Sequence, residues 1–479
     1  MADRAEDRSR RVGASAHGHG WHREPYGSVL DLVGWTPLVR LTRVTRGIRT
    51  PVYGKAEFMN PGGSVKDRIG VAIIKAAESR GLLGPGGTVV EGTSGNTGLA
   101  LAMAAAIRGY RCIFTMPDKM SIEKVKLLRA FGAEVVITPT AVAPDHPDHY
   151  INRARAIAGD LPGAFLANQF ENRDNPDAHY RTTGPEIWEQ TGGRVTHFVA
   201  GAGTGGTISG TGRYLKERNP SVRVIGVDPA GSVISGFYET GEVDEGRPYK
   251  VEGLGNDRIP GTLDLEYVDH YVTVDDGDAF RMARRLVAEE GLFVGGSTGL
   301  IVHAALAEAR RLDDPDACLV AILCDWGERY LTKQYDDEWM RNNGFLQRQR
   351  STVAQMAAAK FERLPRLLTA APAMPVRMAV STLSSHNISQ LPVVVDGECV
   401  GSISERRLMA AILSDRSLLD AEVECVMGEP YPVLDEGADG DTAVRLLTGG
   451  AEAVLIRSDT RLDGILTRYD LVRSLAASS

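Results

Sequence analysis

The stretch NPGGSVKDRIG, residues 60–70, places a lysine where a glycine-rich turn becomes a helix. A strand-like apolar run, residues 51–59, precedes the turn, and apolar residues at helical spacing follow it. Ser64 is a suitable residue to cap this helix. Because the first turn of a helix favours anions, a permanently charged ammonium on Lys66 is mildly unfavourable there. A neutral or covalently bound lysine nitrogen avoids that cost; the ordinary alternative is a surface lysine that extends into solvent.

Outward from this stretch, residues 30–345 alternate short apolar runs with helical patterns. GTVVEG is followed by LALAMAAAIRG, RCIFTMP by SIEKVKLLRAFG, and HFVAGAG by ISGTGRYLKERN. Strands with little polar alternation, each leading into a helix, indicate a parallel sheet that is covered on both faces. The sequence therefore predicts an α/β fold of the size of an enzyme domain.

Composition narrows the possible partners. A chain of 479 residues has room for roughly three domains, and its 43% hydrophobic content is enough to build their cores. The net charge of −8 gives no electrostatic reason to expect nucleic acid or an acidic membrane as partner. Small molecules are the expected ligands.

Cysteine usage and the N-terminal residues bear on location. The five cysteines are scattered and form no C-x-x-C pair, so neither a disulfide framework nor a thiolate zinc site is expected, and a reducing cytoplasm fits best. Residues 1–25 are polar, contain no apolar signal core, and are predicted to form a disordered arm. His17, His19 and His22 lie in this arm without a spacing typical of metal ligands, so no metal is expected. No run of eighteen apolar residues is present to span a membrane.

Two glycine-containing loops follow apolar strands and open helices. They are TSGNTG, residues 93–98, and GTGGT, residues 203–207. A glycine-rich turn at a helix N-terminus presents several backbone N–H groups to one anion, as phosphate sites do. The two loops therefore indicate two anion sites, although ordinary strand-to-helix turns can have the same composition.

The character of the sequence changes after residue 345. A charged connector leads to two related segments, residues 388–412 and 451–475, each a strand, a turn, a strand beginning at Gly401 or Gly464, and a helix. Two copies of such a unit suggest a paired module that packs on itself. The predicted domains are an arm (1–25), a catalytic domain (26–347), a linker (348–365) and a tandem repeat (366–479).

Lys66, the two loops and a later GGSTG, residues 295–299, together resemble the fold-type II pyridoxal-phosphate enzymes of the β-replacement branch. The blocks AHYRTTGPEIW, VEGLGNDRIP and EEGLFVGGSTG are similar to those of the cystathionine β-synthase and cysteine synthase family, in the same order. The C-terminal segments resemble that family's regulatory CBS-type repeats. The resemblance covers residue 30 to the end and implies two parallel-sheet subdomains followed by a Bateman-type α/β tandem module.

The resemblance implies pyridoxal 5′-phosphate as cofactor and assigns roles to matching residues. Lys66 would form the Schiff base with the cofactor and later remove the substrate's α-proton. The implied cofactor contacts are Gly203, Thr204, Gly205, Gly206 and Thr207 on the phosphate, Asn96 on the ring hydroxyl, and Ser297 on the pyridine nitrogen. The implied substrate contacts are Thr93, Ser94, Thr97, Gln169 and Gly253.

The implied activity is β-replacement on L-serine or an O-activated serine through an aminoacrylate. Ser297, a serine instead of a carboxylate, would leave the pyridine nitrogen unprotonated, which favours loss of a β-leaving group over transamination. Homocysteine is the expected acceptor, giving cystathionine. The alternatives are a cysteine synthase, a specialised synthase that uses an amine or another nucleophile, and, in a different class, an inactive nucleotide sensor.

Several residues depart from the cystathionine synthase pattern near the expected mouth of the second-substrate site. Phe170, Asn256 and Arg258 replace the residues expected there, and Gly92 and Cys324 replace prolines. Arg258, if it points inward, could pair with an acidic leaving group or with a carboxylate on the nucleophile; the alternative is a solvated arginine. No haem is expected, because no cysteine precedes Cys112 and the haem-bearing members use an N-terminal cysteine ligand.

The second C-terminal repeat contains GILTRYD, which fits the pattern by which such repeats bind a nucleotide ribose, through Thr467 and Asp470. In the first repeat Arg407 takes the place of the aspartate. One adenosyl ligand per tail is therefore expected, with packing alone as the alternative. The resemblance also implies a homodimer or homotetramer.

Overall fold

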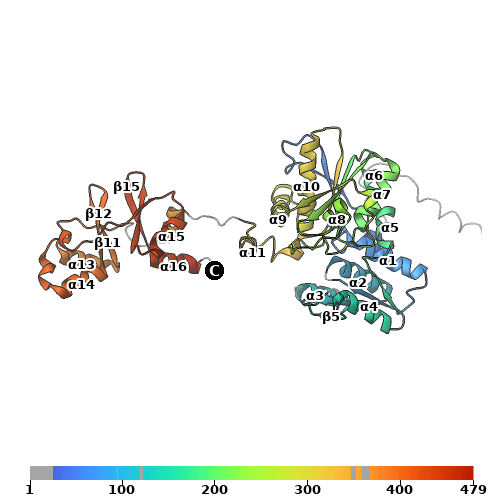
Figure 1. Cartoon of the computed structure of the whole chain (residues 1–479), viewed down its shortest axis with the longest axis horizontal. Coiled ribbons are helices and arrows are strands. Elements are labelled where there is room, and N and C mark those ends of the chain that lie inside the picture. The colour runs from blue at the N-terminus through green and yellow to red at the C-terminus, as the bar shows by residue number, and fades with distance from the viewer. Residues whose placement is uncertain are drawn as a thin grey trace, which may run out of the picture. The chain divides into compact units, whose positions relative to one another are not determined.

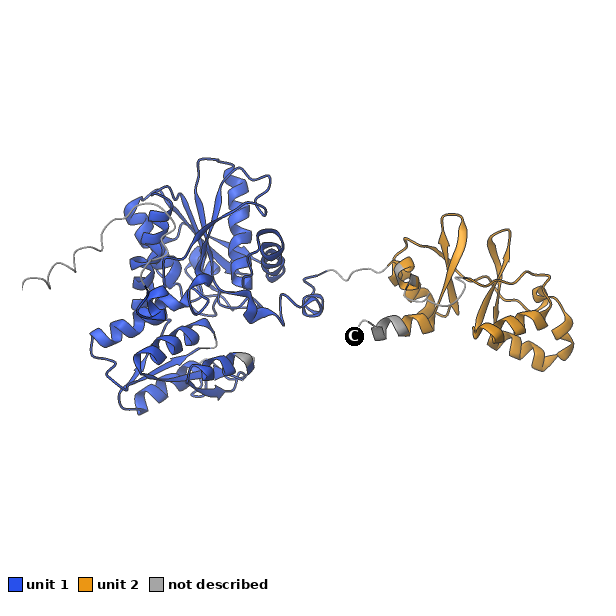
Figure 2. Ribbon diagram, turned by 180° about the vertical axis from the view of Figure 1, so that it is seen from behind, with its two compact units in different colours: residues 1–347 blue, residues 348–479 orange. Residues whose placement is uncertain are grey.

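The computed structural model describes residues 25–93, 95–118, 122–143, 145–346, 352–358 and 367–477. The chain divides into two compact units, Met1–Gln347 and Arg348–Ser479 (Figure 2). Apart from Pro25, the predicted N-terminal arm lies outside the described residues. Each unit is described by itself below.

Unit 1 contains a six-stranded sheet in the order β1-β2-β10-β7-β8-β9. Its strands are β1 (Leu38–Leu41), β2 (Val52–Ala56), β10 (Leu319–Leu323), β7 (His197–Gly201), β8 (Arg223–Pro229) and β9 (His270–Val274). All neighbours are parallel except β1, which runs antiparallel to β2 at the edge. Every residue of β10 is buried, as expected for a strand covered on both faces. The accompanying helices are α6 (Thr183–Gln190), α7 (Gly206–Arg218), α8 (Ile234–Thr240), α9 (Asp276–Arg285), α10 (Gly296–Leu312) and α11 (Asp337–Asn342).

A second sheet of unit 1 has four parallel strands in the order β5-β4-β3-β6. They are β5 (Glu134–Thr138), β4 (Arg111–Pro117), β3 (Thr88–Gly92) and β6 (Ala164–Leu166). Figure 1 shows α2 (Asn96–Arg108), α3 (Ile122–Ala130) and α4 (Tyr150–Asp160) gathered with β5 in this lobe. Helix α1 (Lys66–Ser79) packs on α2 and on α5 (Asp174–Arg181), and α5 packs on α7. The prediction of two parallel-sheet subdomains is confirmed.

Helices that carry predicted site residues begin shortly after the carboxyl ends of strands. Helix α2 begins four residues after β3, and α7 begins five residues after β7. Strand β3 belongs to the four-stranded sheet and β7 to the six-stranded sheet, so each sheet places one of these helix starts at the carboxyl ends of its strands. The 3₁₀ helix η2 (Glu57–Met59) and the turn containing Gly62 and Gly63 separate β2 from α1.

Unit 2 contains two similar halves. The first pairs β11 (Gln390–Val395) with β12 (Glu398–Ser404) beside α13 (Val376–His386) and α14 (Glu405–Ser414). The second joins β13 (Val433–Asp435), β14 (Ala453–Ser458) and β15 (Arg461–Thr467) with α15 (Gly440–Thr448) and α16 (Arg468–Ala477). The predicted tandem α/β module is confirmed.

One detail of the repeat prediction is wrong. Strands β12 and β15 begin at Glu398 and Arg461, three residues before the predicted starts at Gly401 and Gly464. In each half the strand pairing shifts register next to the glycine, between Val393 and Val394 in the first half. Such a bulge, with a glycine in the strand interior, interrupts the sequence pattern without ending the strand.

Part of the predicted linker, residues 348–365, forms the helix α12 (Val353–Ala358) of unit 2. The Val353 backbone N–H donates to the Ala438 carbonyl at 2.9 Å. Val353 and Ala357 are buried in one core with Ala443 and Leu447. The connector therefore supplies apolar side chains to the second repeat in addition to joining the units.

Two negative findings apply to the described ranges only. None of the helices there is long and apolar enough to cross a membrane. Nor are three or more His, Cys, Asp and Glu side chains placed together there to hold a metal ion. His17, His19 and His22 lie outside those ranges.

Candidate active site

The carboxyl end of β10 joins three segments that carry predicted cofactor residues. The bonds are Val65 N to Cys324 O (2.9 Å), Asn96 Nδ2 to Asp325 Oδ2 (2.8 Å), and Cys324 N to Thr298 Oγ1 (2.8 Å). Lys66 follows Val65, and Ser297 precedes Thr298. The structure therefore brings Lys66, Asn96 and Ser297 to one place, although their segments are far apart in the sequence.

Lys66 is the first residue of α1 and is part-buried. The N-cap position is Val65, and the Ser64 hydroxyl accepts a 3.3 Å hydrogen bond from the Lys66 backbone N–H instead of capping the helix. Burial lowers the pKa of the Lys66 amine, opposed by Cys324 and Asp325 nearby. No described residue accepts a hydrogen bond from its Nζ. The amine is thus more easily neutral than an ordinary lysine and is free to react.

Asp325 is a site residue that the sequence reasoning missed. It is buried, and its Oδ2 accepts hydrogen bonds from Asn96 and, at 2.6 Å, from the Tyr330 hydroxyl. Its Oδ1 has no hydrogen-bond partner among the described residues, and burial raises the pKa of the carboxyl. Polar residues directly after a fully buried strand, as in LCDWGERY, are the signal that could have identified it.

Arg329, from the same stretch, links the turn before α1 to the start of α2. Its Nη1 donates to Asn96 Oδ1 at 2.8 Å, and its Nη2 donates to the Gly62 carbonyl at 2.6 Å. Together with Asp325, it holds both ends of the Asn96 amide. The Asn96 side chain therefore has one defined orientation at the start of α2.

The predicted substrate contacts lie at the start of α2 and after β6. The Thr97 hydroxyl donates to Gln169 Oε1 at 2.6 Å, and Thr93, Thr97 and Gln169 are all buried. Glu91 accepts the Gln169 backbone N–H at 3.4 Å, and burial raises the pKa of its carboxyl to about 7. Ser94 lies outside the described residues.

The glycine loop before α7 requires its glycines. A Cβ at Gly203 would lie 2.3 Å from the Gly253 carbonyl oxygen, and one at Gly206 would lie 1.9 Å from Asn175 Oδ1. Gly205 has a φ of +86°, in the left-handed region that favours glycine. The bare backbone N–H groups at this helix start form an anion cradle of the kind that holds phosphate. The residues present therefore fit a phosphorylated cofactor.

Two residues that sequence reasoning did not single out support this loop. Asn175 Nδ2 donates to Thr204 Oγ1 and to the Gln169 carbonyl, both at 2.9 Å, and so ties the loop to the predicted substrate contacts. His179 bonds Thr207 through Nε2 at 3.2 Å and Thr183 through Nδ1 at 2.9 Å. Burial lowers the pKa of His179 well below its ordinary value, so this imidazole is a neutral positioning group.

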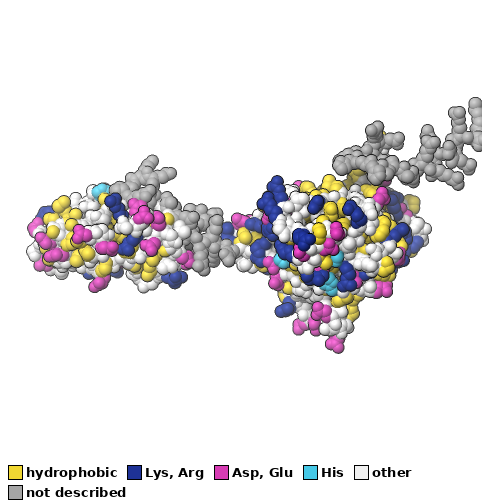
Figure 3. Space-filling view, turned by 90° about the horizontal axis from the view of Figure 1, so that it is seen from above, with side chains coloured by type: hydrophobic (Ala, Val, Ile, Leu, Met, Phe, Trp, Pro, Cys, Tyr) yellow, Lys and Arg dark blue, Asp and Glu magenta, His cyan; other side chains and the backbone are white. Residues whose placement is uncertain are grey.

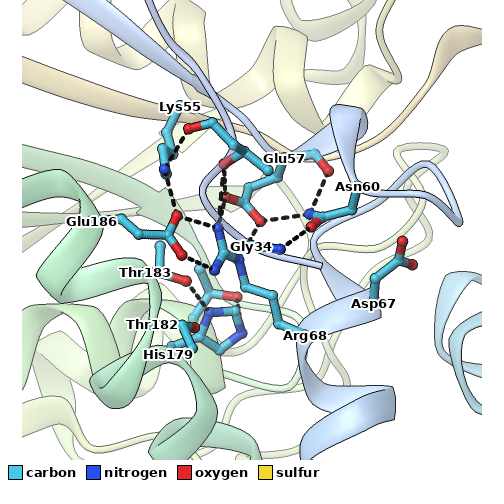
Figure 4. A network of polar contacts seen from close by, with 12 residues as sticks. Gly34, Lys55, Glu57, Asn60, Asp67, Arg68, His179, Thr182, Thr183 and Glu186 are labelled. Carbon is cyan, nitrogen blue, oxygen red and sulfur yellow. Dashed lines mark hydrogen bonds and ion pairs between the residues drawn. The ribbon is translucent and has the colours of Figure 1, made fainter. Parts of the chain in front are cut away.

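A buried ionic network surrounds Arg68, in the first turn of α1 (Figure 4). Its ion pairs are Lys55 Nζ to Glu186 Oε2 (2.7 Å), Arg68 Nε to Glu57 Oε2 (2.7 Å) and Arg68 Nη1 to Glu186 Oε1 (2.6 Å). Burial opposes ionisation of both carboxyls, yet Arg68 holds the pKa of Glu57 and Glu186 below their ordinary value. The network connects β2, η2, α1 and α6, and thereby fixes the first turn of α1 in unit 1.

Asp67 lies outside these ion pairs (Figure 4). Its Oδ2 accepts the Gly62 backbone N–H at 2.5 Å, whereas its buried Oδ1 has no hydrogen-bond partner among the described residues. Burial raises the pKa of Asp67 from its ordinary value to about 7. Ionisation of this carboxyl in the folded state is therefore costly.

Replacing Asp67 by asparagine is expected to change how stability depends on pH. Because the folded-state pKa is raised, the wild-type protein loses stability as pH rises from about 4 to about 7. Asp67→Asn lacks this loss, so its stability relative to wild type should rise by roughly 3 kcal/mol between pH 4 and pH 8. Thermal unfolding across this range measures it, with the exposed Asp160→Asn as control. Parallel pH profiles for Asp67→Asn and wild type would contradict the assignment.

Comparisons with known proteins identify the family of the chain. The family model described as pyridoxal-phosphate dependent enzyme matches residues 29–325, and the CBS domain model matches residues 363–414. A cystathionine beta-synthase of Dictyostelium discoideum is 38% identical over 94% of this chain and 92% of its own length. The crystal structure of an O-acetylserine dependent cystathionine beta-synthase from Helicobacter pylori is 39% identical, with a TM-score of 0.60 over 65% of this chain and 98% of that one. An O-ureido-L-serine synthase structure is 41% identical, with a TM-score of 0.60 over 66% and 100%.

Proposed function

Because the chain belongs to the cystathionine β-synthase family of pyridoxal-phosphate dependent enzymes, we propose that it catalyses β-replacement on L-serine or an O-activated serine. Homocysteine is the proposed acceptor and cystathionine the product. The observation that carries the proposal is the convergence of Lys66, Asn96 and Ser297 at the carboxyl end of β10.

Pyridoxal phosphate, when bound, supplies an electron sink for negative charge at the substrate's α-carbon. The backbone N–H groups of residues 203–207 would hold its phosphate, and Asn96 its ring hydroxyl. Ser297 is buried at the start of α10 and would face the pyridine nitrogen. A hydroxyl in this place, unlike a carboxylate, does not favour a protonated ring nitrogen.

Lys66 would serve first as the covalent anchor of the cofactor and then as the base. Its lowered pKa and its position at the positive end of α1 both disfavour the ammonium form. Once the substrate's amino group has displaced it, the free amine can accept the α-proton. The buried ionic network around Arg68 would hold the first turn of α1 in place, and with it the position of the Lys66 amine in both roles.

The substrate carboxylate would bind where α2 begins. Thr93, Thr97 and Gln169 offer polar groups there, and the unpaired N–H groups of a helix start favour an anion. The Gly253 carbonyl approaches Gly203 so closely that a Cβ at Gly203 would not fit. Figure 3 shows positive and negative side chains interspersed on the visible face of unit 1, which suits small-molecule substrates better than a polyanion.

The donor and the acceptor are tested with the protein loaded with pyridoxal phosphate. Serine, O-acetylserine and O-phosphoserine are added in turn while the visible absorbance of the bound cofactor is followed. At least one donor is expected to change the spectrum, and homocysteine is expected to reverse the change with release of cystathionine. Failure of homocysteine with every donor would contradict the proposal. Turnover with sulfide as the only effective acceptor would instead establish a cysteine synthase.

For unit 2 we propose a regulatory role with one adenosyl ligand bound at the second repeat. Thr467 and Asp470 lie together: the Thr467 hydroxyl donates to Asp470 Oδ2 at 2.8 Å. A paired hydroxyl and carboxylate can bind the two hydroxyls of a ribose. Calorimetric titration of the full chain with adenosyl compounds tests this, and loss of binding in Asp470→Ala is the expected result. Unit 2 would also join copies into the proposed homodimer or homotetramer.

A further inference from the structure

We propose that Arg258, held over the ring of Phe170, forms a subsite for an anionic oxygen group of a substrate: either the carboxylate that the second substrate carries away from its reacting atom or a phosphate leaving group on the donor. This inference rests on the proposed function and narrows its substrate class. It assigns a use to two of the residues that depart from the family pattern.

The loop that carries Arg258 is fastened to the candidate site on both sides. Before Arg258, the Gly255 N–H donates to the Ala202 carbonyl at 2.9 Å, and Asn256 Nδ2 donates to the Gly203 carbonyl at 3.3 Å. After it, the Thr262 N–H donates to the Phe170 carbonyl at 3.1 Å. Arg258 is therefore fixed beside the glycine loop and the residue that follows Gln169.

Arg258 is half-buried, and no residue in the described part of the chain supplies a counter-ion. Its Cζ lies 5.2 Å from the centroid of the Phe170 ring. Within the described ranges, no carboxylate lies at ion-pair distance from Arg258, and no group accepts a hydrogen bond from it. Stacking on an aromatic ring orients a guanidinium but uses none of its five N–H donors. The orientation thus leaves a forked set of donors for a ligand.

The charge of Arg258 also reaches the other lobe of unit 1. Burial raises the pKa of Tyr150, at the start of α4, and the charge of Arg258 opposes this shift. Burial lowers the pKa of His149, and Arg258 lowers it further. The adjoining Asp257 is exposed, so its carboxylate can be satisfied by water. Arg258 therefore stacks on Phe170, which follows β6, and its charge acts on residues at the start of α4, so it faces elements of the lobe that contains the four-stranded sheet.

The chemistry of the reaction identifies the ligand class. Gln169 is assigned to the carboxylate of the first amino acid, and Phe170 is its direct neighbour in the chain. A second anion bound over Phe170 would therefore lie close to the carboxylate of the first amino acid but would belong to a different chemical group. Homocysteine carries such a carboxylate beyond its thiol, whereas sulfide carries none. A phosphate leaving group on the donor has the same oxyanion chemistry, and a guanidinium binds either in a bidentate manner.

The test compares homocysteine with 3-mercaptopropylamine, which is the same thiol without the carboxylate. In Arg258→Leu the KM for homocysteine should rise about 10- to 100-fold, the usual effect of removing a charge-assisted hydrogen bond. The KM for 3-mercaptopropylamine should change less than about twofold, since it has no anion to lose. In Arg258→Lys, which keeps the charge but not the forked donors, the KM for homocysteine should lie between the values for wild type and for Arg258→Leu. The matched control is Arg247→Leu, which removes an exposed arginine from the same loop segment after α8.

A binding measurement and a donor comparison complete the test. Calorimetric titration of borohydride-treated holoenzyme with each thiol reports affinity without turnover and should show the same discrimination. If Arg258→Leu instead lowers kcat/KM for O-phosphoserine but not for serine, the anion belongs to the donor and the subsite stands. Equal effects on both thiols, with no donor effect, overturn the inference. In that case a wild-type spectral response to a donor would show that the proposed function survives; no response to any donor would show that it fails too.

Discussion

Replacement of Lys66 by alanine is expected to lower turnover by at least about 10⁴-fold, because it removes both the covalent anchor of the cofactor and the base. The structure supports a single amine in this role. Lys66 lies at the start of α1 beside Asp325 and Cys324, its pKa is lowered by burial, and no described group holds its Nζ. Steady-state release of product from serine and homocysteine measures the effect.

The control is Lys75→Ala, which removes an exposed lysine from the same helix and should leave turnover unchanged. Borohydride treatment of the holoenzyme followed by peptide mapping gives an independent readout, with the label expected on Lys66. Turnover within about tenfold of wild type in Lys66→Ala, or a label on another lysine, would contradict the mechanism.

Replacement of Arg68 by methionine is expected to destabilise unit 1 by about 3 to 5 kcal/mol. The cause is the charge that remains: Glu57 and Glu186 are buried, and both depend on Arg68 to stay ionised. Without it, the hydrogen bonds to the Glu57 carboxylate come from the neutral Thr36 and Asn60. The nearby charge of Lys55 is already paired with Glu186. Thermal unfolding of the full chain, following the transition of unit 1, measures the loss.

A double replacement separates loss of charge balance from loss of packing. Glu57→Leu with Arg68→Met leaves the Lys55–Glu186 pair neutral overall and should be less destabilising than Arg68→Met alone. Arg213→Met is the surface control, since Arg213 forms an exposed pair with Glu217 and should cost less than about 1 kcal/mol. An Arg68→Met protein as stable as this control would contradict the assigned role of the network.

Much of the fold followed from local patterns. Continuous apolar runs that each lead into a helix predicted a parallel sheet, the family resemblance implied two such sheets, and both are present. The glycine loop at residues 203–207 was predicted as an anion site from its position between a strand and a helix, and its geometry fits that role. Such features are visible in sequence because helix starts, glycine turns and strand hydrophobicity depend on adjacent residues.

The supporting residues were not predictable in this way. Asn96 and Asp325 are separated by 229 positions, and Arg68 and Glu186 by 118, so no local pattern relates them. The strand starts at residues 398 and 461 were misplaced for the same reason: a bulge depends on the partner strand, and a glycine in the sequence does not show which side of it remains paired.

The sequence by itself pointed to Lys66 as the amine proposed to carry the chemistry, since it places this lysine at a helix start and contains two further loops typical of anion sites. Only the tertiary structure decided that burial lowers the pKa of this amine and that Arg258 stands over Phe170 with no ion-pair partner among the described residues. The physical reason is that desolvation and charge pairing depend on which distant segments surround a group, whereas the order of residues along the chain does not specify that environment.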